Sequence, residues 1–214
     1  MSILVTQSLH GSISFYRGAN VEWREKAHKS LCELLGRVYP DELPEPAQRG
    51  IDFENTIFNM IRSNRDIDKV ECSEYFKIFI KACKGGKFQK KVKAFLTIDG
   101  DEYCIYGKID VAFPNKIIDI KTTGKWTRWS EENYYKQVQH HFYCWIERIK
   151  EFEYMIAIFN DKEKRVVDYR SIPYEAMEWG EEEKLITQEI RDMRDFLEKE
   201  PELFDLWHNT YSLY

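Results

Sequence analysis

The sequence predicts an α/β protein in which a mixed central β-sheet is flanked by helices. Three observations lead to this fold class. Apolar residues recur with helical spacing toward both ends of the chain, three strands with period-two alternation fill its centre, and one helix separates them from two further strands. Strands interrupted by a crossover helix are typical of a mixed sheet with helices on its faces.

Length and composition fit one globular domain. The chain has 214 residues, of which 43% are hydrophobic and 32% charged. We predict a single domain over 1–214, with an N-terminal helical segment at 1–49, a core at 50–172 and a C-terminal helical segment at 173–214. No stretch approaches the roughly 20 apolar residues of a membrane span, and the first residues lack a signal-peptide layout. We therefore expect a cytoplasmic protein without a membrane partner.

The first part of the chain predicts two helices around a loop. A helical pattern covers about residues 20–37, and three prolines make 40–46 a loop, because proline removes a backbone donor and restricts its predecessor. The next helix has an apolar stripe made of Phe53, Ile57, Met60 and Ile61. Glu54 lies at the edge of that stripe.

The centre and the end of the chain predict five strands and two helical regions. Strands are expected at 87–98, 102–113 and 116–122, the first two joined by a turn at Asp99 and Gly100. A helix at 131–150 follows its N-cap Ser130. Its expected buried stripe consists of Tyr135, Val138, Phe142, Ile146 and Ile149. Strands at 153–159 and 165–172 precede a helical region from 173 to about 199.

Two carboxylates and a lysine are expected on the polar face of adjacent strands. Asp110 lies in one strand, and Asp119 and Lys121 alternate in the next. Two carboxylates with a backbone carbonyl make an oxygen site that suits Mg²⁺ or Mn²⁺. An ion bound there polarises a phosphoryl oxygen and lowers the pKa of a bound water. The alternative is an ordinary solvated ion pair between Asp119 and Lys121.

The helix after these strands carries Gln139 and Tyr143 one turn apart, beside the apolar stripe. They can point along the helix toward a phosphate held at the strands. Alternatively they are an exposed glutamine and a half-buried tyrosine, and Glu54 is a solvated charge. His140 and His141 are adjacent and point about 100° apart, so we expect neither to be a metal ligand.

Together these residues resemble the RecB-like branch of the PD-(D/E)XK nuclease superfamily. Gly107 and Asp110 have G-x-x-D spacing, Asp119–Thr122 matches (D/E)-x-K-T, and Gln139 with Tyr143 matches Q-x-x-x-Y. The segment 50–54, with Gly50 and Glu54, resembles the upstream helix motif of that family. The resemblance implies a restriction-endonuclease-like α/β core and makes 50–172 the catalytic core.

The resemblance also implies a role for each residue. Asp110 and Asp119 would bind Mg²⁺ or Mn²⁺ with the main-chain oxygen of Ile120, and Glu54 would complete that site or hold a second ion. Lys121 would be the catalytic lysine. The remaining two, Gln139 and Tyr143, would orient the DNA strand and the lysine.

The implied activity is that of a metal-dependent deoxyribonuclease. An exonuclease acting in recombination, repair or phage DNA metabolism is favoured over a restriction enzyme, because the chain has no recognition domain. The related proteins are CRISPR-associated adaptation and phage recombination exonucleases, which places this chain in a bacterial cell or a phage-infected host. DNA is the expected partner. A homo-oligomer, or a separate helicase or annealing protein, is left open because helicase motifs are absent.

Two other functions stay open. One is a non-catalytic nucleic-acid-binding protein on a decayed nuclease fold, which the retained carboxylates and Lys121 argue against. The other is an unrelated metal-dependent hydrolase or lyase that uses the same carboxylates.

The cysteines do not form the iron–sulfur pattern of many RecB-like proteins, which use one early and three late cysteines. The five here are scattered without a C-x-x-C pair, and none follows Cys144. We therefore expect reduced thiols and no iron–sulfur cluster.

A local basic track is compatible with the net charge of −5. Residues 81–93 contain six lysines and no acid, and Lys87, Lys90 and Lys91 are candidate DNA contacts. The alternative is a strand edge protected by solvated lysines. The loop at 125–129 supplies the further candidates Lys125, Trp126, Arg128 and Trp129, which suit phosphate contact and base stacking. The two tryptophans are equally compatible with capping the core.

Overall fold

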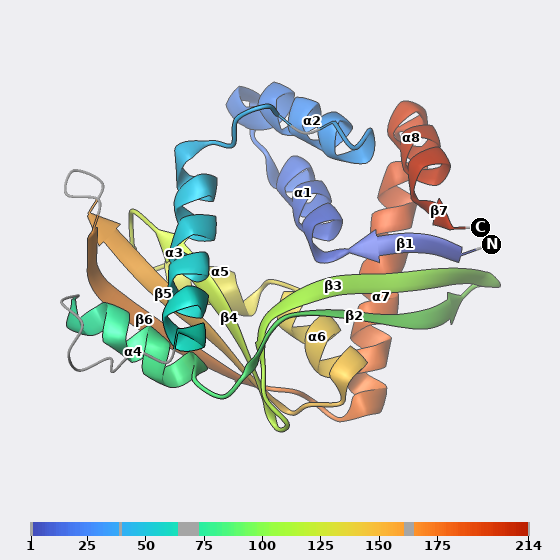
Figure 1. Ribbon diagram of the computed structural model, residues 1–214. Coiled ribbons are helices and arrows are strands. Elements are labelled where there is room, and N and C mark those ends of the chain that lie inside the picture. Colours follow the sequence, from blue (N-terminus) through green and yellow to red (C-terminus); the bar gives the residue numbers. More distant parts are fainter. Residues whose placement is uncertain (1, 39, 64–72, 161–164, 214) are drawn as a thin grey trace.

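The computed structural model describes residues 2–38, 40–63, 73–160 and 165–213, and it has the predicted mixed sheet flanked by helices (Figure 1). The strands are β1 (Ser2–Thr6), β2 (Lys87–Ile98), β3 (Asp101–Ala112), β4 (Lys116–Thr123), β5 (Glu151–Asn160), β6 (Arg165–Glu175) and β7 (Ser212–Leu213). The helices are α1 (Gln7–Gly18), α2 (Val21–Leu35), α3 (Glu45–Arg62), α4 (Glu74–Cys83), α5 (Ser130–Tyr135), α6 (Gln139–Glu147), α7 (Trp179–Leu197) and α8 (Pro201–Tyr211).

The sheet has the order β6-β5-β4-β3-β1-β7, and β2 pairs with β3 as well. β4 runs parallel to β5 and β1 parallel to β3, while the other pairs are antiparallel. The chain passes from β4 to its parallel neighbour β5 through α5 and α6, as expected for a parallel pair with a helical crossover.

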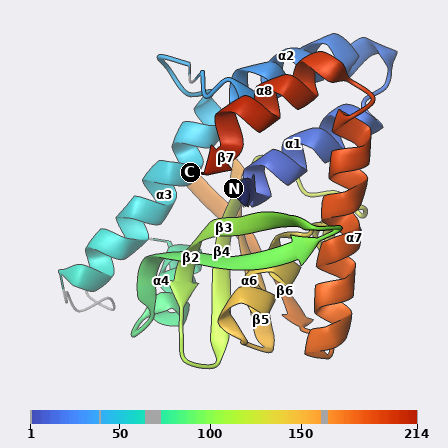
Figure 2. The same ribbon diagram turned by 90° about the vertical axis from the view of Figure 1, so that its right-hand side faces the viewer.

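Two apolar clusters lie on the two sides of the sheet. Figure 2 shows α3 and α4 on one side and α6 and α7 on the other. Phe53, Ile57 and Phe79 from α3 and α4 pack with Ile118 and Ile120 of β4 in one cluster. The larger cluster joins the other side of the sheet to α6 and α7, and it extends to α1, α2 and α8 beyond β1.

The N-terminal segment differs from the prediction, because it is not wholly helical. Residues 2–6 form β1, which pairs in parallel with 102–106 of β3, and α1 follows directly with Thr6 as its N-cap. The side chain of Thr6 accepts a hydrogen bond from the N–H of Leu9 at 3.1 Å. The C-terminal segment also contributes strands, since β6 reaches Glu175 and β7 pairs with β1.

Two predicted boundaries are wrong, that of the loop at 40–46 and that of the helix at 131–150. α3 begins at Glu45, so Pro46 lies in its first turn, where its missing N–H needs no partner. The helix expected over 131–150 is two helices, α5 and α6, and α6 ends where Arg148 adopts a left-handed conformation. Tyr135, placed in the buried stripe, is 45% exposed at the end of α5. α4 and α8 were not predicted as separate helices.

None of the described helices combines the length and apolarity needed to cross a membrane. The described cysteines, Cys32, Cys83, Cys104 and Cys144, are free thiols, and Cys72 lies outside the described residues.

Candidate functional site

The site lies at a gap along one edge of β3. One edge of β3 is paired with β2 along almost the whole strand. The other two neighbours of β3, which are β1 and β4, therefore both lie along its second edge. There β1 pairs with 102–106, and β4 pairs only with Val111 and Ala112. Among the residues that the structure describes, none therefore forms a strand beside 107–110 on that edge. Gly107, Lys108 and Asp110 line a cavity of about 570 Å³ that opens at this gap.

The three residues of the predicted carboxylate and lysine site line this cavity together. Asp110 accepts a hydrogen bond from the backbone N–H of Ile120 at 2.8 Å, which links the diverging ends of β3 and β4. Lys121 Nζ forms an ion pair with Oδ2 of Asp119 at 2.6 Å, and that buried oxygen has no other donor among the described residues. The Asp119 side chain is 2% exposed, whereas that of Lys121 is 32% exposed and reaches the cavity.

The electrostatics of the site reflect two carboxylates in a buried position. Burial, and next the neighbouring charge of Asp119, raise the pKa of Asp110 well above its usual range. Burial opposes the charged form of Lys121, but Asp119 and Asp110 outweigh it and raise the pKa of the lysine. Lys121 is therefore an ammonium at neutral pH, and it cannot act as a base there.

α6 brings Gln139 and Tyr143 to the same cavity. Gln139 is buried, and its Nε2 donates to Oδ1 of Asp119 at 2.5 Å. Tyr143 lies against Gly107, where an added Cβ would come within 2.2 Å of the tyrosine ring, and its hydroxyl donates to the carbonyl of Lys108 at 3.2 Å. Both side chains are more buried than the sequence indicated, and they fix the position of Asp119 and of the β3 backbone.

Glu54 approaches the site from α3. Its carboxylate accepts a hydrogen bond from Gln89, which has a positive φ of 55° within β2. Burial raises the pKa of Glu54, Lys108 counteracts that shift, and Asp119 adds to it. These interactions put Glu54 near the cavity, although it is not one of the residues that line it.

The donor set fits a hard divalent cation. Gln139 Oε1 is a buried acceptor without a donor in the described structure, and Asp119 Oδ2 is a buried acceptor that has only the ammonium of Lys121 beside it. Two carboxylates and a carbonyl, with waters, suit Mg²⁺, which commonly keeps several waters. Within the described ranges, no three side chains of His, Cys, Asp or Glu gather as ligands of one ion. The carbonyl of Ile120 and the carboxylate of Glu54 as ligands stay predictions.

Replacing Asp110 by asparagine is expected to stabilise the metal-free protein at neutral pH by about 0.5–2 kcal/mol. Because the folded protein raises the pKa of Asp110, protonated Asp110 favours the folded state. This contribution to the free energy of unfolding is fully present below the pKa that Asp110 has in the unfolded chain, and it is lost as pH rises through the pKa in the folded protein. Asparagine carries no charge, so this loss of stability does not occur, and its side-chain oxygen can still accept the hydrogen bond from the N–H of Ile120. The measurement is thermal unfolding with and without Mn²⁺, which should raise the melting temperature of the wild type but not of the variant.

The matched control is Asp168→Asn, which changes an aspartate paired with Arg170 on the surface of β6. It should leave the response to Mn²⁺ intact. An Asp110→Asn variant that is less stable without metal, or that keeps the full Mn²⁺ response, would contradict this prediction.

Several cavity residues were missed by sequence interpretation. Thr6 and Gln7 come from the β1–α1 junction, Arg37 from the end of α2, Tyr106 from β3 and Tyr211 from α8. The run of three apolar residues before Thr6, a good N-cap, is the sequence signal for β1 and α1. No local pattern could place Arg37 or Tyr211 here, because they depend on packing between distant helices.

The candidate DNA contacts lie outside the cavity. β2 occupies the other edge of β3, and there Lys87 and Lys91 are exposed while Lys90 pairs with Glu147. Lys125 lines a second cavity with Arg49 and residues 122–124.

The two tryptophans of the loop have different environments. Trp126 is stacked on Tyr134 with 6.1 Å between ring centroids and packs against the core. Trp129 is 57% exposed, and the guanidinium of Arg128 lies 4.6 Å from its ring. Core capping therefore describes Trp126, and only Trp129 is available for stacking.

The two histidines of α6 face other partners. Nδ1 of His140 lies 3.0 Å from the hydroxyl of Tyr154, and Nδ1 of His141 lies 2.7 Å from Glu182. Burial, and next the neighbouring His141, lower the pKa of His140 to about 3, so it is neutral. Neither histidine lines the cavity at Asp110.

No protein-family model matches this chain, and no curated protein matches it in sequence. Solved structures are similar to it at low identity. A structure described as SSO0001 has a TM-score of 0.51 at 12% identity, covering 89% of this chain and 77% of that one. That similarity is one of fold, and it agrees with the mixed α/β architecture.

Two exonucleases are also among the structural neighbours. A phage-related exonuclease from Haemophilus somnus 129PT has a TM-score of 0.48 at 13% identity and covers 94% of this chain and 96% of its own. An alkaline exonuclease from Laribacter hongkongensis has a TM-score of 0.47 at 14% identity, with 96% and 92% covered. Both scores are below 0.5, so no functional conclusion follows from them.

Proposed function

We propose that this chain is a metal-dependent deoxyribonuclease that acts as an exonuclease in recombination, repair or phage DNA metabolism. One observation carries the proposal: Asp110, Asp119, Lys121 and Gln139 converge on one cavity where β3 and β4 diverge. A solvated ion pair needs neither the buried second carboxylate nor the glutamine that holds Asp119.

The chemistry is the hydrolysis of a phosphodiester bond. Asp110 and Asp119, with the carbonyl of Ile120, would hold a divalent ion, which would supply Lewis acidity and lower the pKa of the attacking water. Water adds to phosphorus, the bond to the leaving oxygen breaks, and that oxygen takes up a proton. The ammonium of Lys121 stabilises the negative charge that develops on the phosphoryl oxygens. Gln139 holds Asp119, and Tyr143 holds the backbone at Lys108.

The test uses end-labelled linear DNA and closed circular DNA, each incubated with Mg²⁺ or Mn²⁺ and sampled over time. An exonuclease releases short labelled products from linear DNA and leaves circles intact. Asp119→Ala should abolish cleavage. Binding of DNA by the wild type without any cleavage under these conditions would instead support a non-catalytic protein on a nuclease fold. Inhibition by small phosphoesters as effective as that by DNA would support an unrelated hydrolase.

A double change of Lys87 and Lys91 to glutamine is expected to weaken DNA binding and flatten its dependence on salt. Each lost phosphate contact should reduce the log–log slope by roughly 0.7–0.9. Lys90→Gln is the matched control, because Lys90 pairs with Glu147 and should contribute less. The measurement is fluorescence anisotropy over a salt series. An unchanged slope in the double variant would show that β2 is a solvated edge and would move the contacts to Lys125 and Arg128.

A further inference from the structure

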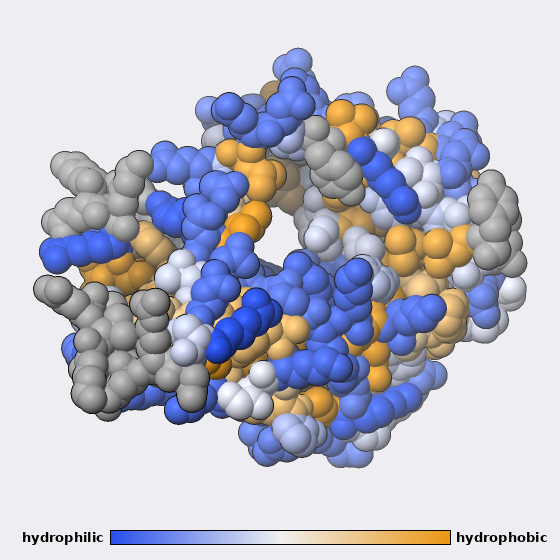
Figure 3. Space-filling view, viewed as in Figure 1, coloured by the Kyte–Doolittle hydropathy of each residue, from blue (hydrophilic) through white to orange (hydrophobic). Residues whose placement is uncertain are grey.

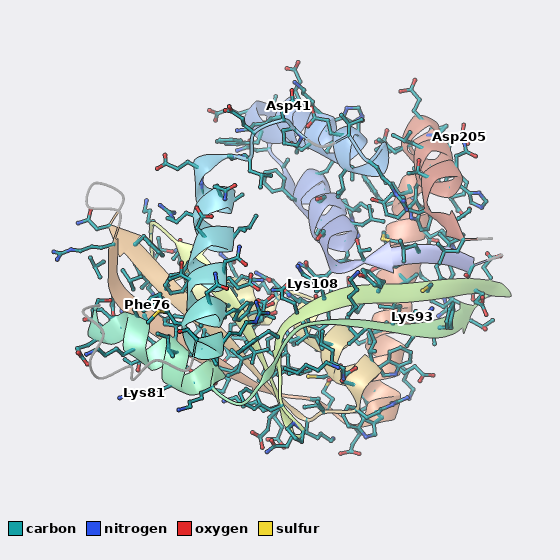
Figure 4. The ribbon with its side chains drawn as sticks, in the orientation of Figure 1. Asp41, Phe76, Lys81, Lys93, Lys108 and Asp205 are labelled. Carbon is teal, nitrogen blue, oxygen red and sulfur yellow. The ribbon has the colours of Figure 1, made fainter. Side chains whose placement is uncertain are left out.

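A further cavity, of about 660 Å³, lies between α3, α4 and the end of β5, and it shares no lining residue with the cavity at β3. Its floor is aromatic, because the ring centroid of Phe53 lies 5.6 Å from that of Phe76 and 5.5 Å from that of Phe159. Phe76 belongs to α4 and lies beside α3 (Figure 4). Leu43, which also lines the cavity, is 44% exposed. We call this cavity the α3 groove.

The α3 groove is acidic as well as apolar. Among the described residues that line it, Glu42, Glu45 and Asp52 are acidic and exposed, whereas only Arg49 is basic. Figure 3 shows hydrophilic side chains over α3, the helix that carries most of these charges. An excess of carboxylates repels phosphates, so the groove does not suit DNA. It suits a segment that carries cations beside a large apolar side chain.

The loop at 125–129 has the complementary chemistry. Trp129 is 57% exposed, and the guanidinium of Arg128 lies 4.6 Å from its ring. Lys125 is exposed as well, and the sequence contains no acidic residue from 122 to 130. The loop therefore presents an aromatic ring between cations, which is the combination that the α3 groove can accept.

The loop is also held in shape. Trp126 is stacked on Tyr134 and packs against the core, and the N–H of Thr127 donates to the hydroxyl of Ser130 at 2.9 Å. Trp129 therefore projects from an ordered backbone, so that docking it costs little additional conformational entropy. Tryptophan and arginine side chains that enter a pocket in this way supply most of the energy of many interfaces.

The α3 groove and the loop lie side by side. Glu45 and Arg49 line the groove, and they also line the cavity that Lys125 and residues 122–124 border. In the described structure, none of residues 125–129 lines the groove, so the loop does not fill the groove of its own chain. A two-fold axis that passes between loop and groove brings the loop of each copy to the groove of the other.

We propose that two copies of this chain form a two-fold symmetric dimer, in which the loop at 125–129 of each copy occupies the α3 groove of the other. Trp129 packs on the aromatic floor, and Arg128 and Lys125 pair with Glu42 and Asp52. Because each copy supplies one loop and one groove, the contact closes and assembly stops at the dimer. The dimer needs neither metal nor DNA, so it stands or falls independently of the nuclease function.

Sedimentation velocity without metal or DNA tests the dimer, over protein concentrations of about 1–100 µM, the range that suits a small interface. The wild type should pass from monomer to dimer and no further. Trp129→Ser should raise the dissociation constant roughly tenfold or more. The matched control is Phe95→Ser, which removes another exposed aromatic ring, one that lies 5.6 Å from the ammonium of Lys93. A wild type that is monomeric throughout, or that grows beyond a dimer, would overturn the proposal.

An exchange of charges identifies the two surfaces. Arg128→Glu on one chain, and Glu42→Lys with Asp52→Lys on another, should each give a monomer, because each places like charges opposite one another. Mixing the two variants should restore a dimer, since both contacts of the mixed pair again join opposite charges. Lys184→Glu, a charge reversal on the exposed surface of α7, should leave the wild-type dimer intact. A mixture that stays monomeric would show that the loop does not enter the groove.

Nucleic acid is the other candidate partner of the loop. If Trp129→Ser and Arg128→Glu weaken the binding of DNA but leave self-association unchanged, the loop contacts DNA and the proposed dimer is wrong. All the substituted side chains are exposed, and circular dichroism checks that each variant is folded before its association is compared.

Discussion

Replacing Lys121 by alanine is expected to lower kcat about 10²–10³-fold, the usual effect of removing one preorganised charged group from a transition state. The ammonium lies beside Asp119 and lines the cavity, and the two aspartates raise its pKa. It is therefore charged throughout the working pH range and needs no reorganisation when negative charge develops on the phosphate. The measurement is single-turnover cleavage of end-labelled DNA with Mn²⁺ at saturating enzyme.

The same variant should keep its metal site, because Asp110 and Asp119 are unchanged. Mn²⁺ should still raise its melting temperature, and by more than in the wild type, since the ion then also compensates the buried carboxylate that has lost its lysine. The matched control is Lys116→Ala, which removes a lysine from the same strand that pairs with Glu153. Equal turnover in both lysine variants and the wild type would identify the Asp119–Lys121 contact as an ordinary ion pair.

The sequence predicted the parts of the site that depend on local alternation. A period of two residues puts Asp119 and Lys121 on one face of β4, and a period of four puts Gln139 and Tyr143 on one face of α6. Both relations follow from backbone geometry alone. The mixed sheet with flanking helices was likewise predicted from the order of strands and helices, and the structure confirms it.

The parts that sequence analysis missed depend on contacts between distant residues. β1 has only five residues, and its parallel pairing with 102–106 crosses about a hundred positions of the chain. That pairing, with the short contact between β3 and β4, creates the gap where Gly107 and Asp110 lie.

A second large effect is expected for Glu182→Ala, which should lower the free energy of unfolding by about 1–3 kcal/mol for each buried polar group that loses its partner. Glu182 lies in α7 and is fully buried. Its carboxylate accepts hydrogen bonds from the hydroxyl of Tyr174 at 2.7 Å and the N–H of Met177 at 2.8 Å, and it lies 2.7 Å from Nδ1 of His141. Removing it leaves the N–H of Met177 without its acceptor, and it leaves the Tyr174 hydroxyl and Nδ1 of His141, which lie 2.9 Å apart, with only each other.

The pH dependence of the free energy of unfolding shows whether Glu182 stabilises the protein as an ionised carboxylate or only by filling space. Burial alone would raise the pKa of Glu182, but the hydrogen bonds from His141 and Tyr174 outweigh it and lower the pKa. Its stabilising contribution is therefore present above the unfolded pKa and is lost as pH falls through the folded pKa. Urea denaturation across that acidic range should show a shallower decline for Glu182→Gln than for the wild type. Glu181→Ala, an exposed neighbour in α7, should behave as the wild type does.

Loss of Glu182 should also reduce catalysis in the protein that remains folded. His141 ties α6 to α7 through Glu182, and Gln139, two residues earlier in α6, holds Asp119 at the cavity. Without the contact between His141 and Glu182, α6 can shift relative to α7. A displacement of about 1 Å near reacting groups can lower the rate about 10²-fold. The measurement is kcat of Glu182→Gln at a temperature where circular dichroism shows it fully folded. An unchanged kcat with reduced stability would mean that Glu182 stabilises the fold without positioning the site.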